Sequence, residues 1–389
     1  MPLFNVRPLS LFARLRMPAV FVLTLLLLLN SCDTPEKVLK SPDLAYKEAR
    51  ARYWFEKKEY FKCIPVLEEL IGLMKGRQSV EDLYYMYCMA NYKQGDYMIS
   101  AYHFKNFFDQ YGSNPKAEEC LYMYAKSYQQ LSPKPSLDQT YTYKALEAYA
   151  FFLSMYPDSK FITETNTAVN DLRRKLERKA LMNAELYFKT GNFKAAATSY
   201  ENLLTDFPDI QENEKIGYMI IKANYKYALN SIPEKKAARF NHVIESYNDF
   251  KYKFPTSKYL EESRKYEQMS QYQAVKSAFE WADYTGLGDK DRAYAIAFNE
   301  AKKHDTQVKD EKLKADFAEW TEKGHFMLIK YAYQLGEEKR TVEKKAVFEK
   351  TVRNYLNFVD LFPNSRYKNE AEKLFNQANE QLKKLASHG

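Results

Sequence analysis

Hydrophobic residues recur along most of this chain at the spacing of amphipathic helices. Apolar side chains stand at positions 200, 203, 204 and 207, and the same spacing returns at 355, 358, 359 and 362. Residues three, four and seven apart share one face of an α-helix, whereas a half-buried strand alternates at every second residue. Because strand-type alternation is missing from the sequence, the pattern predicts an all-α protein.

A recurring stop signal divides the helical pattern. The segments 156–161, 254–259 and 362–367 share the order aromatic, proline, polar residue, serine, basic residue, aromatic. Proline ends the preceding helix, the polar residue or serine is expected to cap the next one, and the second aromatic is expected to pack back across the turn. Weaker copies stand at 207–209 and 111–112.

The stops give the preceding helices a common register, counted back from Gly112, Pro157, Pro208, Pro255 and Pro363. Twelve positions earlier there is always a small or β-branched residue, eight positions earlier an aromatic ring, and five positions earlier Phe or Leu. We expect the small residue to lie where two helices touch. The three sets are Ser100, Ala145, Ala196, Val243 and Thr351; Phe104, Tyr149, Tyr200, Tyr247 and Tyr355; and Phe107, Phe152, Leu203, Phe250 and Phe358.

A tight turn precedes several of these helices. Glycine stands at 95 and 191, and Lys58 holds the same place in a first copy. Seven residues before each turn-forming segment there is a small residue, namely Ala51, Cys88 or Ala184. This order resembles the tetratricopeptide repeat and implies a solenoid of antiparallel helical hairpins.

The N-terminus has the organisation of an export signal. Three arginines precede an apolar run at 20–29, and Ser31 then stands directly before Cys32. This order resembles a bacterial lipobox, which implies cleavage after residue 31 and a covalent lipid on Cys32. An ordinary signal peptide and a transmembrane anchor are the alternatives, but a span needs about 20 apolar residues and this run is shorter. We expect a signal peptide at 1–31 and a lipidated linker at 32–44.

Charge and candidate chemistry narrow the function classes. The formal net charge is +8, and basic and acidic residues are interspersed, so a nucleic-acid footprint is not expected. Cys63, Cys88 and Cys120 cannot all pair within one chain, and the first two occupy small positions of the repeat. The five histidines lack metal-ligand spacing, and no catalytic or phosphate-binding motif is present. We expect no enzyme activity, no metal and no cofactor besides the lipid.

Aromatic residues are dense in the first helix of each early hairpin. Consecutive tyrosines on one helix point in different directions, so some are expected to line a groove that binds extended peptides ending in an aromatic residue. Simple packing of the tyrosines is the alternative. The candidate groove residues are Tyr53, Trp54, Tyr84, Tyr87, Tyr124 and Tyr128.

The chain resembles the BamD family of outer-membrane β-barrel assembly lipoproteins in the order of its features. The lipobox is followed by Tyr46, the aromatic segment 53–55, successive repeats and a loop with two prolines at 132–140. The resemblance covers roughly residues 32–272, with the repeats at 45–272. It implies a scaffold anchored by lipid to the periplasmic side of the outer membrane. Its implied partners are a BamA-like barrel protein at the later repeats, other assembly subunits, and unfolded outer-membrane protein segments at the first two or three repeats.

Two features depart from this resemblance. Residues 273–389 form an extension with helical periodicity over 293–303, 313–335 and 342–362, where one degenerate and one recognisable repeat are expected. Asp33 resembles a signal for retention in the inner membrane. A SusD-like carbohydrate-binding lipoprotein that works with an outer-membrane transporter is the alternative function, and an envelope scaffold with a peptidoglycan or division partner is a third.

Overall fold

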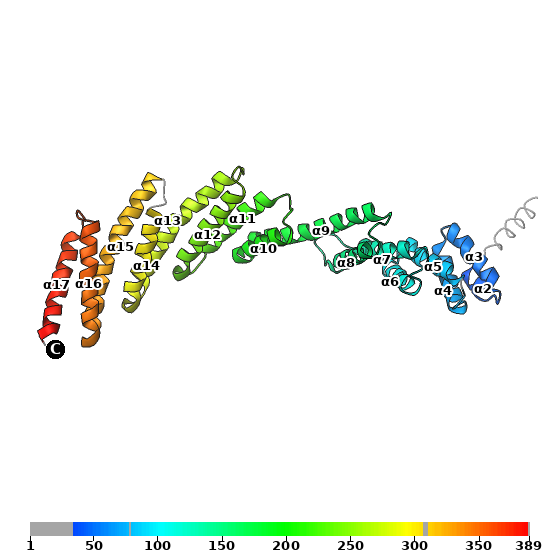
Figure 1. Cartoon of the computed structure of the whole chain (residues 1–389), viewed down its shortest axis with the longest axis horizontal. Coiled ribbons are helices and arrows are strands. Elements are labelled where there is room, and N and C mark those ends of the chain that lie inside the picture. Colours follow the sequence, from blue (N-terminus) through cyan, green and yellow to red (C-terminus); the bar gives the residue numbers. More distant parts are fainter. Residues whose placement is uncertain (1–33, 78, 306–309, 388–389) are drawn as a thin grey trace, which may run out of the picture. The chain divides into compact units, whose positions relative to one another are not determined.

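The computed structural model describes residues 34–77, 79–305 and 310–387, and over these ranges the chain forms sixteen helices and no strand (Figure 1). This confirms the predicted all-α repeat fold. The predicted signal peptide, Cys32 and Asp33 lie outside the described residues. Among the helices that the structure describes, none is long and apolar enough to cross a membrane.

The chain divides into two compact units at residues 176 and 177. In unit 1, the successive helices between residues 44 and 155 pack on one another as antiparallel hairpins around one continuous core, which also takes in Ala168 and Leu172 of the next helix. We call the odd-numbered helices from α3 onward A helices and the even-numbered ones from α4 onward B helices. The helices of unit 1 are α2 (Pro35–Leu39), α3 (Leu44–Glu56), α4 (Tyr60–Leu73), α5 (Val80–Gln94), α6 (Tyr97–Gln110), α7 (Ala117–Leu131), α8 (Thr140–Met155) and the first half of α9 (Ile162–Lys189).

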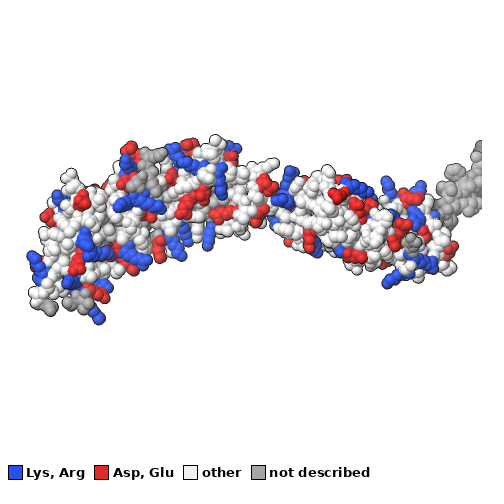
Figure 2. All heavy atoms as spheres, viewed as in Figure 1, with Lys and Arg blue, Asp and Glu red and all other residues white. Residues whose placement is uncertain are grey.

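Unit 2 continues the same alternation and includes the C-terminal extension. Helices cover each of the three segments where the extension was expected to be helical, and α13 runs through residue 272 without a break. Lys, Arg, Asp and Glu are mixed over the visible face of each unit (Figure 2). After α9, the helices are α10 (Phe193–Asp206), α11 (Asn213–Leu229), α12 (Pro233–Lys253), α13 (Leu260–Tyr284), α14 (Leu287–Asp305), α15 (Glu311–Glu338), α16 (Thr341–Leu361) and α17 (Lys368–Ser387).

The residues at the three positions counted back from the stops lie in the core of both units. All five residues of the small set are fully buried, and every residue of the third set is at most 3% exposed. In the ring set Tyr355 is half-buried, and the other four rings are buried. Full burial of one such ring or leucine contributes about 1.5–3 kcal/mol. The three cysteines are also free and buried, and burial raises the pKa of the Cys63 thiol to about 12.

The tight turns share one backbone geometry. Gly95 and Gly191 have φ of 97° and 81°, and Lys58 has φ of 61°. In each turn the following N–H donates to the carbonyl five residues earlier, and in the first turn Glu59 N lies 2.8 Å from Trp54 O. This hydrogen bond belongs to the Schellman motif, which ends a helix through a left-handed residue. Lysine therefore occupies a conformation that glycine adopts at lower cost.

The serine of each stop acts differently from the prediction. Its hydroxyl accepts a hydrogen bond from the N–H two residues later, in the turn before the helix, and α13 itself has no side-chain cap. The hydroxyl also donates to a glutamate on the preceding A helix. The Oγ–Oε pairs are Ser159–Glu118 at 2.5 Å, Ser257–Glu214 at 2.8 Å and Ser365–Glu322 at 2.5 Å. We call this pair of hydrogen bonds the serine latch.

The second aromatic of each stop packs against the same A helix, beyond the turn across which the sequence predicted its contact. It stacks on the ring four residues after the latch glutamate, with interplanar angles of 4°, 11° and 6°. A basic residue lies over the outer aromatic in all three copies. Each stop therefore joins one A helix to the next. The stacked pairs are Tyr122–Phe161 at 4.3 Å, Tyr218–Tyr259 at 5.1 Å and Phe326–Tyr367 at 4.7 Å between ring centroids.

The loop with two prolines connects α7 to α8 and is held by hydrogen bonds. Gln139 is 3% exposed, and its amide donates to the carbonyls of Lys134 and Leu137 at 2.9 and 3.0 Å. From α9, Lys175 Nζ donates to the carbonyl of Ser132 at 3.1 Å and to its Oγ at 3.0 Å. The loop is therefore fixed at both of its ends.

Candidate functional site

A cavity of about 290 Å³ opens in unit 1 between the B helices α4 and α6, over the A helix α5. Two of the predicted groove residues, Tyr84 and Tyr87, line it. Their rings face the B helices, whereas the sequence predicted a groove lined by A helices. The other lining residues are Glu68, Ile71, Gly72, Lys75, Val80, His103, Gln110 and Tyr111.

His103 and the two tyrosines form the wall of the cavity. Tyr84 Oη lies 3.1 Å from His103 Nδ1, and the Tyr87 ring meets the imidazole edge-on at 4.8 Å between centroids. Burial raises the pKa of Tyr84 and lowers the pKa of His103, although Glu68 opposes the shift on the histidine. At neutral pH the wall therefore carries uncharged aromatic groups that offer hydrogen bonds.

Charge is confined to the mouth of this cavity. Glu68 and Lys75 are exposed, and in the part of the chain that the structure describes neither side chain makes an ion pair or hydrogen bond. They stand seven residues apart on α4 and just beyond its end, which corresponds to about 10 Å along a helix. The mouth thus presents one negative and one positive group at separate places.

Exposed apolar residues extend the same faces of α4 and α6. Phe61 is 61% exposed and lies seven residues before Glu68, while Ile99 is 47% exposed and lies four residues before His103. Residues at these spacings share a helix face. Tyr102, 64% exposed, packs edge-on against His103 at 5.0 Å. We call the cavity together with Phe61, Ile99 and Tyr102 the B-face groove.

The other four predicted groove residues do not line the cavity, and one of them is buried in the core. Trp54 is 1% exposed, so it is a core residue and cannot contact a ligand. Tyr53 is 44% exposed and lies under the Arg50 guanidinium at 4.6 Å. Tyr124 and Tyr128 are half-buried and meet edge-on at 5.2 Å, away from the lining of the cavity.

Apart from Tyr84 and Tyr87, the residues of the groove were not predicted from the sequence, and three of them carry its polar chemistry. His103, Lys75 and Glu68 were not predicted, because the histidines were considered only as metal ligands and the B helices only as packing elements. A signal was present, since His103 follows Ile99 by four residues and precedes Gln110 by seven on one face of α6. That face combines polar residues with exposed apolar ones. A helix that serves only to pack against its neighbours has no need of exposed apolar residues.

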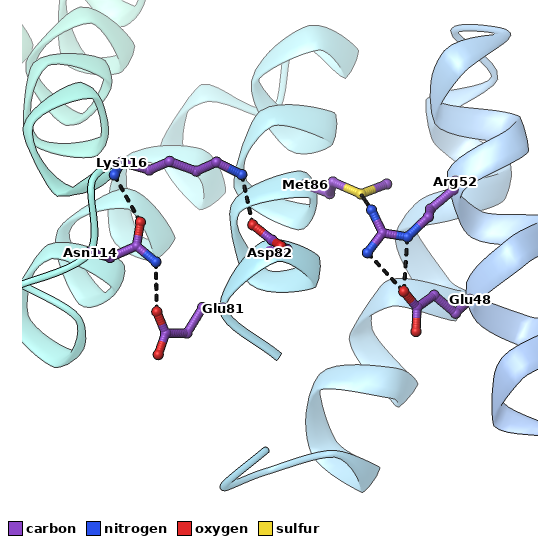
Figure 3. A network of polar contacts seen from close by, with 7 residues as sticks. All are labelled: Glu48, Arg52, Glu81, Asp82, Met86, Asn114 and Lys116. Carbon is purple, nitrogen blue, oxygen red and sulfur yellow. Dashed lines mark hydrogen bonds and ion pairs between the residues drawn. The ribbon is translucent and has the colours of Figure 1, made fainter. Parts of the chain in front are cut away.

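The A helices of unit 1 carry paired charges beside this region (Figure 3). Arg52 on α3 donates to Glu48 at 2.9 Å and contacts Met86 Sδ on α5 at 3.5 Å. At the start of α7, Lys116 donates to Asp82 at 2.8 Å, and this hydrogen bond lowers the pKa of the carboxyl group. These charges satisfy one another, so this surface offers fewer unpaired groups to a ligand than the B-face groove.

Comparison with known proteins gives a family match. A family model described as "YfiO: Outer membrane lipoprotein" matches residues 40–240. The "Putative outer membrane protein assembly factor BamD" of Aquifex aeolicus (strain VF5) is 27% identical over 205 residues, which cover 51% of this chain and 65% of that protein. The chain thus spans slightly less than two thirds of this relative. The whole B-face groove lies inside the matched range.

The solved structures that match this chain have low sequence identity to it and low TM-scores. The TPR2AB domain of yeast Sti1 in complex with pHSP90 is 12% identical, covers 72% of this chain and 98% of its own, and has a TM-score of 0.29. A tetratricopeptide repeat protein from Parabacteroides merdae is also 12% identical, covers 86% of this chain and 98% of its own, and has a TM-score of 0.25.

Proposed function

Because the chain belongs to the YfiO family of outer membrane lipoproteins, we propose that it works as a subunit of the machinery that assembles β-barrel proteins in that membrane. The family is a non-enzymatic scaffold class related to BamD. Family membership therefore favours this role over the alternative of SusD-like carbohydrate capture. Covalent lipid on Cys32 would hold the scaffold at the periplasmic surface of the membrane.

The proposed client is an unfolded outer-membrane protein segment that ends in an aromatic residue. The observation that carries this proposal is the aromatic cavity of the B-face groove, which is small for a whole ligand but suits one ring. Edge-to-face contacts with Tyr87 and His103 would hold that ring. The Tyr84 hydroxyl and the Gln110 amide would bind the peptide backbone.

The two charged residues at the mouth of the cavity would determine the orientation in which the client peptide binds. Lys75 would attract the terminal carboxylate of the segment, whereas Glu68 would repel it. The C-terminus should therefore lie at the end of α4, with the preceding residues running toward Phe61 and Ile99. Binding by these first hairpins leaves the later repeats for a BamA-like barrel protein and other assembly subunits, as the resemblance to BamD implies.

Peptide binding measured by fluorescence anisotropy tests the client proposal. The ligand is a ten-residue outer-membrane protein C-terminus that ends in Phe, compared with the same peptide carrying a C-terminal amide. Lys75→Glu should weaken binding of the carboxylate peptide by about tenfold, and wild-type protein should bind the amide more weakly than the acid.

A matched control separates this site from general charge effects. Lys93→Glu changes an exposed lysine at the end of α5, outside the cavity lining, and should leave binding unchanged. Equal losses in Lys75→Glu and Lys93→Glu, or equal binding of the acid and the amide, would contradict the proposed site.

A further inference from the structure

A second cavity, of about 480 Å³, lies in unit 2 and is separate from the proposed client site. It opens between the B helices α12 and α14 over the A helix α13. Three alanines, Ala237, Ala238 and Ala278, stand where larger side chains would fill the space. The volume falls within the roughly 300–1,000 Å³ of small-molecule sites.

Trp281 forms the aromatic wall of this cavity. The side chain is half-buried, and within the described residues no other ring and no cation packs on its indole face. The other tryptophan of unit 2, Trp320, is also half-buried, but its ring contacts the rings of Tyr272, Phe279 and Phe317. Trp281 therefore keeps a flat apolar surface that is available to a ligand.

The deep end of the cavity holds a fixed carboxylate. Asn241 on α12 donates to Glu300 on α14 at 2.7 Å, and His304 Nε2 donates to the same oxygen at 2.9 Å. Burial raises the pKa of Glu300, but these two hydrogen bonds and the charge of Lys303 outweigh burial and leave the pKa below its usual value. Glu300 is thus an ionised acceptor held in one position.

The open end carries groups of both signs. Glu234, Asp289 and Arg292 line the cavity, and in the ranges that the structure covers their side chains make no hydrogen bond or ion pair with the rest of the chain. The three carboxylates, including Glu300, repel an anionic ligand, and the guanidinium of Arg292 repels a cationic ligand only where it approaches that side chain. A neutral ligand with many hydroxyl groups avoids both repulsions, because hydroxyls donate to carboxylates and accept from arginine.

We propose that this cavity is a binding site for a neutral saccharide, with the C–H face of one sugar ring stacked on Trp281 and its hydroxyls bound by Glu300, Asp289 and Arg292. Most of the lining comes from α13 and α14, in residues after 240, and so lies beyond the range of the family match. The proposal does not depend on the client-binding function, and it gives the protein a glycan as a further partner.

Isothermal titration of the full chain in detergent with maltotriose, cellotriose and chitotriose tests the proposal, together with co-sedimentation with purified peptidoglycan sacculi. We expect saturable binding of at least one probe. Trp281→Ala and Arg292→Gln should each weaken that binding by tenfold or more. Arg292→Gln changes an exposed residue, so it keeps the test valid if Trp281→Ala fails to fold.

Tyr284→Ala is the matched control, because Tyr284 is an 88% exposed aromatic on the same helix and lies outside the cavity lining. It should bind like the wild type. Binding of a trisaccharide identifies the neutral sugar as the ligand, whereas binding of sacculi alone would point to their charged stem peptides and contradict the proposal. The proposal is overturned if no probe binds, if Trp281→Ala and Tyr284→Ala behave alike, or if trilysine binds through Trp281 instead.

Discussion

Lys58 holds a left-handed backbone conformation in a turn where two other copies of the repeat have glycine. That conformation costs a non-glycine residue about 1–2 kcal/mol, and the Lys58 side chain is exposed. Lys58→Gly should therefore raise the free energy of unfolding by about 1 kcal/mol, measured by urea denaturation. Lys57→Gly, at a residue with φ of −77°, is the control and should not stabilise the protein. A destabilised Lys58→Gly variant would contradict this account of the turn.

His325 makes unit 2 sensitive to acid. It is 5% exposed among Phe298 and Phe358, and burial, reinforced by the charge of Lys302, lowers its pKa. The unfolded chain then binds the proton more tightly, so stability falls as the pH drops below the ordinary histidine value of about 6.5.

The variant His325→Leu should reduce this pH dependence. Its free energy of unfolding should fall less between about pH 7 and pH 5 than that of the wild type, because leucine cannot bind the proton. Urea denaturation at several pH values measures the two slopes. Identical slopes would show that His325 does not titrate in this range.

At the scale of the elements, the serine latch is expected to stabilise the start of each A helix. Ser257→Ala removes the hydrogen bond to Glu214 and the one from the Tyr259 amide, at 2.8 and 3.2 Å. The loss should be about 1–2 kcal/mol in urea denaturation. In the double variant with Glu214→Gln, the losses should be less than additive, because both changes remove one interaction. Strict additivity would show that the two residues do not interact.

The helices were predictable from the sequence because prolines and glycines mark their ends locally. The latch glutamates were not, since Glu214 lies 43 residues before Ser257 and a single sequence does not indicate that pairing. A similar limit applies to Tyr53 and Trp54, which are adjacent and both aromatic. Their different exposure depends on neighbouring helices, and the local pattern does not determine it.

At the scale of the whole molecule, attachment to the membrane should depend on Cys32. Within the residues described, no helix could span a bilayer, and the family is one of lipoproteins. Cys32→Ala should move the protein from the membrane to the soluble fraction, measured by immunoblot after sedimentation. Ser31→Ala, which keeps a small residue before the cysteine and keeps the thiol, is a suitable comparison. Full retention of Cys32→Ala on membranes would contradict lipid anchoring.

The serine latch also bears on how the chain would respond to a protease. The proline-containing loop lies between α7 and α8, whereas Glu118 and Tyr122 on α7 bind Ser159 and Phe161 beyond α8. Lys175 on α9 additionally binds Ser132 at the start of the loop. A cut at the exposed residues 136–138 would leave all of these contacts intact. The two pieces of the chain should therefore remain associated, and an affinity tag could be inserted there without dividing unit 1.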